Sequence, residues 1–85
     1  IMYYYVYIIQ NQFGNWYIGY TANIRQRIKD HNQSKNKSTR KYNWKLIYAE
    51  LYLHKKDALG REKFLKSGAG RIFIKKQIKN YLETK

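Results

Sequence analysis

Carboxylates are scarce in this chain, and their number limits the metal chemistry that it could perform. Its 85 residues include 18 Lys and Arg but only five acids. The acids are Asp30, Glu50, Asp57, Glu62 and Glu83. A metal ion would draw on these, because the chain has no cysteine and no pair of histidines at zinc-binding spacing. The chain contains neither a Ser-His-Asp order nor a Walker-type glycine loop, so the sequence indicates neither a serine hydrolase triad nor a nucleotide-binding P-loop.

Glu62 is the acid best placed to form a site. The pattern over residues 55–66 predicts a helix, and Glu62 lies on the same stripe as its apolar residues, facing the buried side. The other four acids are expected at ordinary surface positions, with Glu50 on the solvent side of its strand. An alternative is that Glu62 only forms a partly buried ion pair, with Arg27 or Lys63.

Arg27 and His31 share one face of an earlier helix that is predicted to end near Asn32. Thr21 or Asn23 can cap the start of this helix. Its inward stripe reads Ile24, Arg27, Ile28 and His31. Taken singly, an arginine on a helix surface and a histidine near a helix C-terminus are common without any function. Arg27, His31 and Glu62 are all predicted to point toward the same side of the sheet, and this agreement is the reason to expect a site.

Two tyrosines are expected to lie beside these groups on a β-hairpin. The residues of 3–9 and 16–20 are β-branched and aromatic, and a glycine-containing turn separates them. We expect Tyr7 to pair with Tyr17, and Tyr5 to pair with Gly19 on the same side of the sheet.

The remaining pattern predicts the other elements of the fold. A third strand is expected over residues 44–53, the helix of Glu62 follows, and a last helix is expected over residues 71–82. Gly60 inside a helix suggests a close approach by another element. The predicted fold class is α/β (α+β), a three-stranded antiparallel sheet flanked by helices in the order β-β-α-β-α-α, as a single domain over residues 1–85.

The net charge of +13 suggests a polyanionic partner. An AT-rich genome could inflate the lysine content, although it would not remove the acids. Residues 33–43 predict a basic loop. The longest apolar stretch, residues 1–9, is too short to span a bilayer. We therefore expect an intracellular, cytoplasmic protein that binds nucleic acid and no membrane.

Several motifs together resemble those of the GIY-YIG nuclease domain, most closely its small single-domain bacterial members. Tyr5-Val6-Tyr7 stands at the first motif, and Tyr17-Ile18-Gly19 matches the second. The helix of Arg27 and His31 follows at the expected place, and the run from Arg61 to Gly68 resembles the signature of the second helix. The resemblance covers residues 4–76. Tyr5 replaces the first-motif glycine, and Tyr20 stands where many members have lysine.

The resemblance implies endonucleolytic hydrolysis of phosphodiester bonds in DNA, in repair or recombination, assisted by one Mg²⁺ or Mn²⁺ ion. Glu62 would bind the metal and Arg27 the phosphate. Tyr7 and Tyr17 would orient or deprotonate the attacking water, with Tyr7 the preferred base and Tyr17 the alternative, and His31 would assist. One carboxylate is sufficient, because Mg²⁺ keeps several waters and also binds substrate phosphate.

Basic residues outside this cluster are expected to grip the nucleic acid backbone. They are Lys35, Lys37, Arg40, Lys41, Arg71, Lys75 and Lys76. DNA is favoured over RNA, which stays open, and a protein partner could supply specificity. One alternative is a nucleic-acid-binding module of the same fold that does not cut. Another is a basic protein whose partner is a protein.

Overall fold

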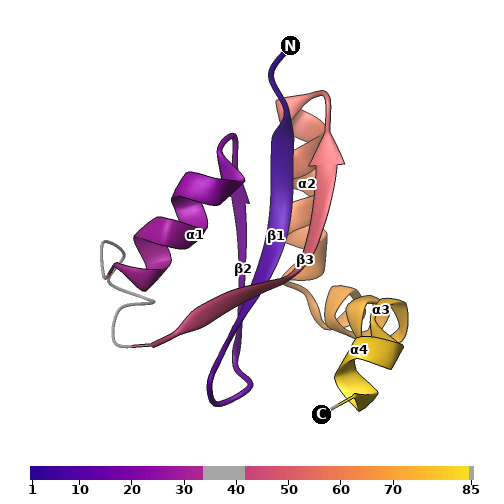
Figure 1. Cartoon of the computed structure of the whole chain (residues 1–85). Coiled ribbons are helices and arrows are strands. Elements are labelled where there is room, and N and C mark those ends of the chain that lie inside the picture. Colours follow the sequence, from indigo (N-terminus) through magenta and orange to yellow (C-terminus); the bar gives the residue numbers. More distant parts are fainter. Residues whose placement is uncertain (34–41, 85) are drawn as a thin grey trace.

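Residues 1–33 and 42–84 are described by the structure, a computed structural model of the chain. The elements are β1 (Tyr4–Asn11), β2 (Trp16–Thr21), α1 (Ile24–Asn32), β3 (Trp44–Tyr52), α2 (Lys55–Leu65), α3 (Gly68–Gln77) and α4 (Lys79–Glu83). The three strands form an antiparallel sheet in the order β2-β1-β3. In Figure 1, α1 lies beside β2, α2 lies behind the sheet, and α3 and α4 lie at its lower end. Lys35, Lys37, Arg40 and Lys41 lie outside the described residues.

The β1–β2 hairpin has a different register from the one expected. Tyr7 pairs with Gly19 and Ile9 pairs with Tyr17, so the expected pairings of Tyr7 with Tyr17 and of Tyr5 with Gly19 are wrong. The turn is the cause. Asn11 pairs with Asn15, and Gly14 adopts a φ of 86°. A three-residue loop of this kind needs a left-handed residue at its end, and glycine takes that conformation at little cost.

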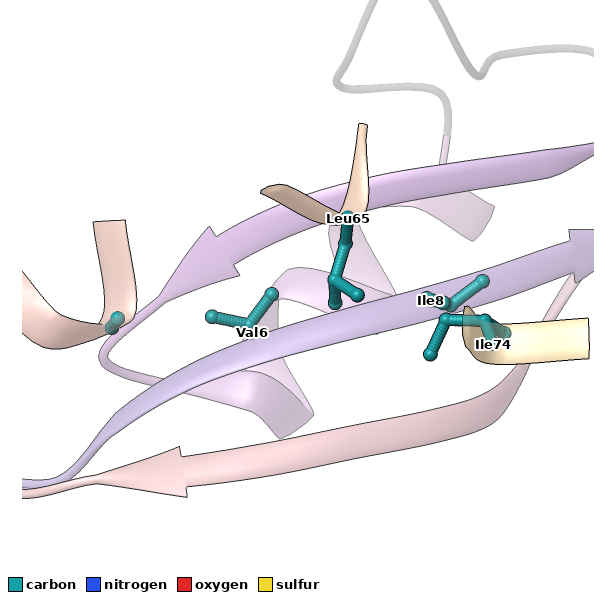
Figure 2. Close-up of a cluster of buried hydrophobic side chains, with 5 residues drawn as sticks. Val6, Ile8, Leu65 and Ile74 are labelled. Carbon is teal, nitrogen blue, oxygen red and sulfur yellow. The ribbon is translucent and has the colours of Figure 1, made fainter. Parts of the chain in front are cut away.

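The central strand β1 is buried on both faces. Val6 and Ile8 point toward Leu65 and Ile74 of the helices on one side, where Ala58 completes the cluster (Figure 2). Tyr7 and Ile9 point to the opposite face and pack with Trp44, and with Ile24 and Ile28 of α1. Because successive side chains of a strand alternate between faces, β1 alone supplies both cores.

The close approach expected at Gly60 occurs at Gly70 instead. A Cβ at Gly60 would meet nothing within 4 Å, since Gly60 lies on the exposed side of α2. A Cβ at Gly70 would overlap the Phe64 carbonyl and the Leu65 Cα, because the start of α3 crosses the end of α2. Ser67 caps α3 by accepting a hydrogen bond from the Gly70 N–H at 3.1 Å.

The predicted last helix is divided into α3 and α4. Ile78, with φ −112° and ψ 32°, departs from helical geometry and packs against the Val6–Ile8 core. Beyond this break, the Tyr81 hydroxyl donates to Gln10 Oε1 on β1 at 3.0 Å. The described part of the chain holds no helix with the length and apolar content to cross a membrane.

Candidate active site

Tyr7 is the centre of the predicted site, and Gly19 gives it room. A Cβ added at Gly19 would overlap the hydroxyl and ring of Tyr7. The Tyr7 ring therefore lies directly over the glycine that ends the Tyr17-Ile18-Gly19 motif. A side chain at position 19 would force the Tyr7 hydroxyl away from its observed place.

Helix α1 brings His31 to the Tyr7 hydroxyl. Tyr7 Oη and His31 Nε2 are 2.8 Å apart in a buried hydrogen bond. The Tyr17 ring meets His31 edge-on, with ring centroids 4.7 Å apart. Tyr17 and Tyr7 lie with their centroids 6.5 Å apart. Three of the predicted residues thus form one contiguous aromatic cluster.

The C-terminal end of α1 is fixed to the start of β3. The Asn32 side chain accepts from the Trp44 N–H at 2.7 Å and donates to the Trp44 carbonyl at 2.9 Å. Asn32 follows His31 directly, so this two-way bond holds the last turn of α1 and the imidazole in position.

Burial sets the protonation states of the Tyr7–His31 pair. Burial raises the pKa of the Tyr7 phenol well above its usual range, Tyr17 and Glu62 raise it further, and Arg27 opposes them. Burial also lowers the pKa of His31, and the nearby Arg27 lowers it further, while Asp30 acts in the opposite direction. Both groups are therefore neutral at neutral pH. The charge of Arg27 does not overcome the burial of Tyr7.

Arg27 and Glu62 approach Tyr7 from two helices that cover opposite faces of the sheet. Both are near enough to act on the pKa of the Tyr7 phenol, with opposite signs. Arg27 is exposed, and within the described residues its side chain makes no hydrogen bond or ion pair. The sheet lies between the two helices (Figure 1). Tyr7, Tyr17 and His31 are thus in direct contact, whereas Arg27 and Glu62 bear on Tyr7 only through their charges.

Glu62 is mostly withdrawn from solvent and pairs with a lysine on its own helix. Its side chain is 19% exposed, and Glu62 Oε2 lies 3.0 Å from Lys66 Nζ. The partner is Lys66, one helical turn further on, rather than Arg27 or Lys63. The Glu62 carboxylate therefore already binds one cationic group. The Lys66 side chain is 55% exposed, so it can turn away into solvent.

The donor set fits one hard divalent ion and excludes a protein-made cage. Nowhere in residues 1–33 and 42–84 do three or more His, Cys, Asp or Glu residues gather to hold a metal. A single carboxylate suits Mg²⁺ or Mn²⁺, which keep waters and take further oxygen ligands from a substrate phosphate. Glu62 meets that requirement.

Glu50 has a role that the sequence interpretation missed. It was expected to face solvent, but it pairs with Val6 and faces α2, where the Arg61 guanidinium binds both carboxylate oxygens at 2.9 and 3.0 Å. The hydroxyls of Tyr48 and Tyr52 also donate to it. Burial alone would raise the pKa of Glu50, yet these hydrogen bonds hold it below its usual range.

The error at Glu50 comes from the incomplete cover of the other face of β3. Leu51, which follows Glu50 and points to the opposite face of β3, is 48% exposed. The signal for the correct orientation was the repeat of Tyr48, Glu50 and Tyr52 on one side of the strand. Because Arg61 precedes Glu62 in α2, the Glu50–Arg61 pair fixes the rotation of the helix that carries Glu62.

The predicted backbone-binding residues of α3 lie away from Tyr7. Arg71, Lys75 and Lys76 are exposed, and the Arg71 guanidinium lies 5.1 Å from the Trp16 ring centroid. Tyr20, which replaces the lysine of many family members, stacks on Tyr4 with centroids 6.3 Å apart. Tyr20 thus contributes packing on the side opposite Tyr7.

Comparison with known proteins agrees with the predicted fold and family. A model of the GIY-YIG catalytic domain matches residues 3–77. The chain belongs to this family, which points to nuclease-type chemistry. The predicted α+β fold is confirmed, with one more helix than expected because α3 and α4 are separate.

The similar proteins include bacterial chains called UPF0213 proteins. One from Streptococcus pneumoniae is 41% identical over 64 residues, which cover 73% of this chain and 65% of that protein, less than two thirds of its length. One from Bacillus licheniformis is 36% identical over 83 residues, covering 95% and 80%. The solution NMR structure of the Bacillus halodurans UPF0213 protein superimposes with a TM-score of 0.58 at 31% identity, covering 91% of this chain and 86% of that one.

Proposed function

We propose that residues 1–85 form a single nuclease domain, a divalent-metal-dependent endonuclease that hydrolyses phosphodiester bonds in DNA during repair or recombination. The observation that carries the proposal is the buried Tyr7–His31 hydrogen bond, whose tyrosine feels the charges of an exposed arginine, Arg27, and a mostly buried carboxylate, Glu62. A chain with a net charge of +13 gains no affinity for DNA from an inward acid. Glu62 therefore favours catalysis over binding alone.

Arg27 provides the contact to the scissile phosphate. Its side chain is exposed at the β2 edge and has no competing partner in the described part of the chain. A guanidinium can donate two hydrogen bonds to phosphate oxygens and stabilise the negative charge that develops in the transition state.

Glu62 would hold the one divalent ion, with Lys66 moving aside into solvent. When bound, Mg²⁺ or Mn²⁺ polarises a phosphoryl oxygen and stabilises the leaving oxygen. Among the acids of the described residues, Glu62 alone acts on the pKa of Tyr7. This influence on Tyr7 supports Glu62 as the residue that would hold the ion.

Tyr7 and His31 together supply the base. The raised pKa of Tyr7 means that a free phenolate is not available at neutral pH. The neutral His31 imidazole lies at 2.8 Å and can take the Tyr7 proton as Tyr7 takes one from the attacking water. One proton moves from water to Tyr7 Oη and another from Oη to Nε2, which leaves hydroxide and an imidazolium. Tyr17, the alternative base, contacts the imidazole edge-on, with ring centroids 4.7 Å apart.

The proposal is tested by Glu62→Gln, which removes the charge and keeps the shape. We expect loss of DNA cleavage in Mg²⁺ or Mn²⁺, with DNA affinity equal to or tighter than that of the wild type. The matched control is Asp57→Asn, an exposed acid on the same helix, which should cut normally. Equal cleavage by the wild type and Glu62→Gln would contradict the catalytic role and favour the non-cutting nucleic-acid-binding module.

A further inference from the structure

We propose that the hollow between the hairpin turn and helices α3 and α4, on the face of the sheet opposite Tyr7, binds a single-stranded nucleic acid segment. The inference rests on the proposal that the chain acts on nucleic acid, and it assigns a second surface, separate from the Tyr7 cluster. The hollow has a volume of about 450 Å³. This is within the range of pockets that hold small ligands and suits one nucleotide.

One wall of the hollow is cationic. Arg71, Lys75 and Lys79 line it from α3 and α4, spaced four residues apart along the chain. Glu83 is the one acid among its lining residues. A net positive wall of this kind attracts a phosphate backbone and releases condensed counterions when the backbone binds.

An aromatic side chain, Trp16, lines the same hollow beside Arg71. Trp16 is half-buried at the start of β2, and the Arg71 guanidinium lies over its ring at 5.1 Å. Indole faces and guanidinium planes are both surfaces on which unpaired bases stack. The Trp16–Arg71 pair thus offers a base platform beside phosphate-binding lysines. A duplex keeps its bases stacked inside and could use only the charges.

The hollow and the cleavage site are connected through the edge strand. Trp16 and Tyr17 are consecutive in β2, so their side chains lie on opposite faces of the sheet. Tyr17 contacts His31 on one face, and Trp16 contacts Arg71 on the other. A strand of nucleic acid that passes along the β2 edge would meet both, so the hollow would take nucleotides flanking the bond that is cut.

The test measures binding of a fluorescein-labelled oligothymidylate by anisotropy in EDTA, where no cleavage occurs. The hollow variant combines Arg71→Ala, Lys75→Ala and Lys79→Ala. The control variant removes the same number of charges from exposed positions on α2, with Lys55→Ala, Lys56→Ala and Lys63→Ala. We expect the hollow variant to lose about tenfold or more in affinity and the control variant about threefold or less. Equal losses would overturn the inference.

The aromatic platform is tested separately. Trp16→Phe keeps a stacking surface and should bind the oligonucleotide nearly as well as the wild type, whereas Trp16→Ala should lose about five-fold or more. A duplex of the same length should be insensitive to both changes, and an equal loss for duplex would overturn the single-strand assignment. Cleavage assays distinguish the two proposals, because a wild type that binds through the hollow but never cuts contradicts only the nuclease function.

Discussion

At the scale of single residues, the site depends on what surrounds Tyr7 and His31 rather than on their unperturbed chemistry. Both are buried, and both are kept neutral by that burial. Two neutral groups in a hydrogen bond cost little to bury, whereas a phenolate or an imidazolium would be expensive there. The charged intermediate would therefore form only when substrate and metal bring new charges to the site.

The buried His31 gives the folded protein a pH dependence. In the folded state the pKa of His31 lies below its ordinary value of 6.5. Near pH 6.5 the unfolded chain therefore binds more protons than the folded one. The free energy of unfolding should therefore rise as the pH increases from about 5 to about 7. Urea denaturation followed by circular dichroism across this range measures the change.

His31→Gln is the control for this pH dependence. It removes the titrating group, so its stability should vary less between those pH values, even if the variant is less stable throughout. A wild-type stability that does not change with pH, or that falls toward neutral pH, would contradict the buried neutral state of His31.

Residue types and helical spacing were sufficient to predict which side chains belong together. Arg27 and His31 were predicted from the inward stripe of one helix, and Glu62 from the stripe of another. The ion-pair partner of Glu62 is Lys66, four residues further along the same helix, where side chains are neighbours, whereas the adjacent Lys63 points in another direction. The rotation of α2 against the sheet was not predictable, because a tertiary contact, the Glu50–Arg61 pair, fixes it.

At the scale of elements, two glycines in neighbouring helices have opposite roles. Gly60 has open space around its missing Cβ, whereas Gly70 is where α3 crosses α2. Gly60→Ala should raise the free energy of unfolding by about 0.8 to 1 kcal/mol, because alanine restricts the unfolded chain and favours the helix. Thermal or urea unfolding checks this.

Gly70→Ala is the contrasting variant. Its methyl group would overlap backbone atoms of Phe64 and Leu65, which cannot move as a flexible side chain does. It should therefore be destabilised. If Gly60→Ala were destabilising as well, the exposed position of Gly60 would be wrong.

The elements themselves were predictable, but two of their details were not. The strands and helices follow from hydrophobic periodicity. The predicted hairpin register was wrong, because the register depends on whether Gly14 takes a left-handed conformation inside a three-residue loop. The break between α3 and α4 was not predicted because Ile78 continues the apolar helical pattern, whereas in the structure it leaves helical geometry and packs against the Val6–Ile8 core.

At the scale of the whole molecule, the net charge of +13 predicts how nucleic acid binding responds to salt. If three or more phosphates are neutralised, affinity for DNA should fall by about tenfold or more between about 50 mM and about 200 mM salt. Anisotropy titrations over this range measure the slope. A flat response would instead indicate a basic protein whose partner is another protein.

The burial of β1 on both faces has a consequence for the persistence of the site. Its backbone is paired along both edges, with β2 and with β3, so fraying of an outer strand leaves one row of its hydrogen bonds in place. Tyr7 is thus carried by the strand that should be the last to open, while Arg27 and Glu62 stand on the two helices that flank the sheet. The Tyr7 hydroxyl should therefore keep its position even when an outer strand of the sheet opens.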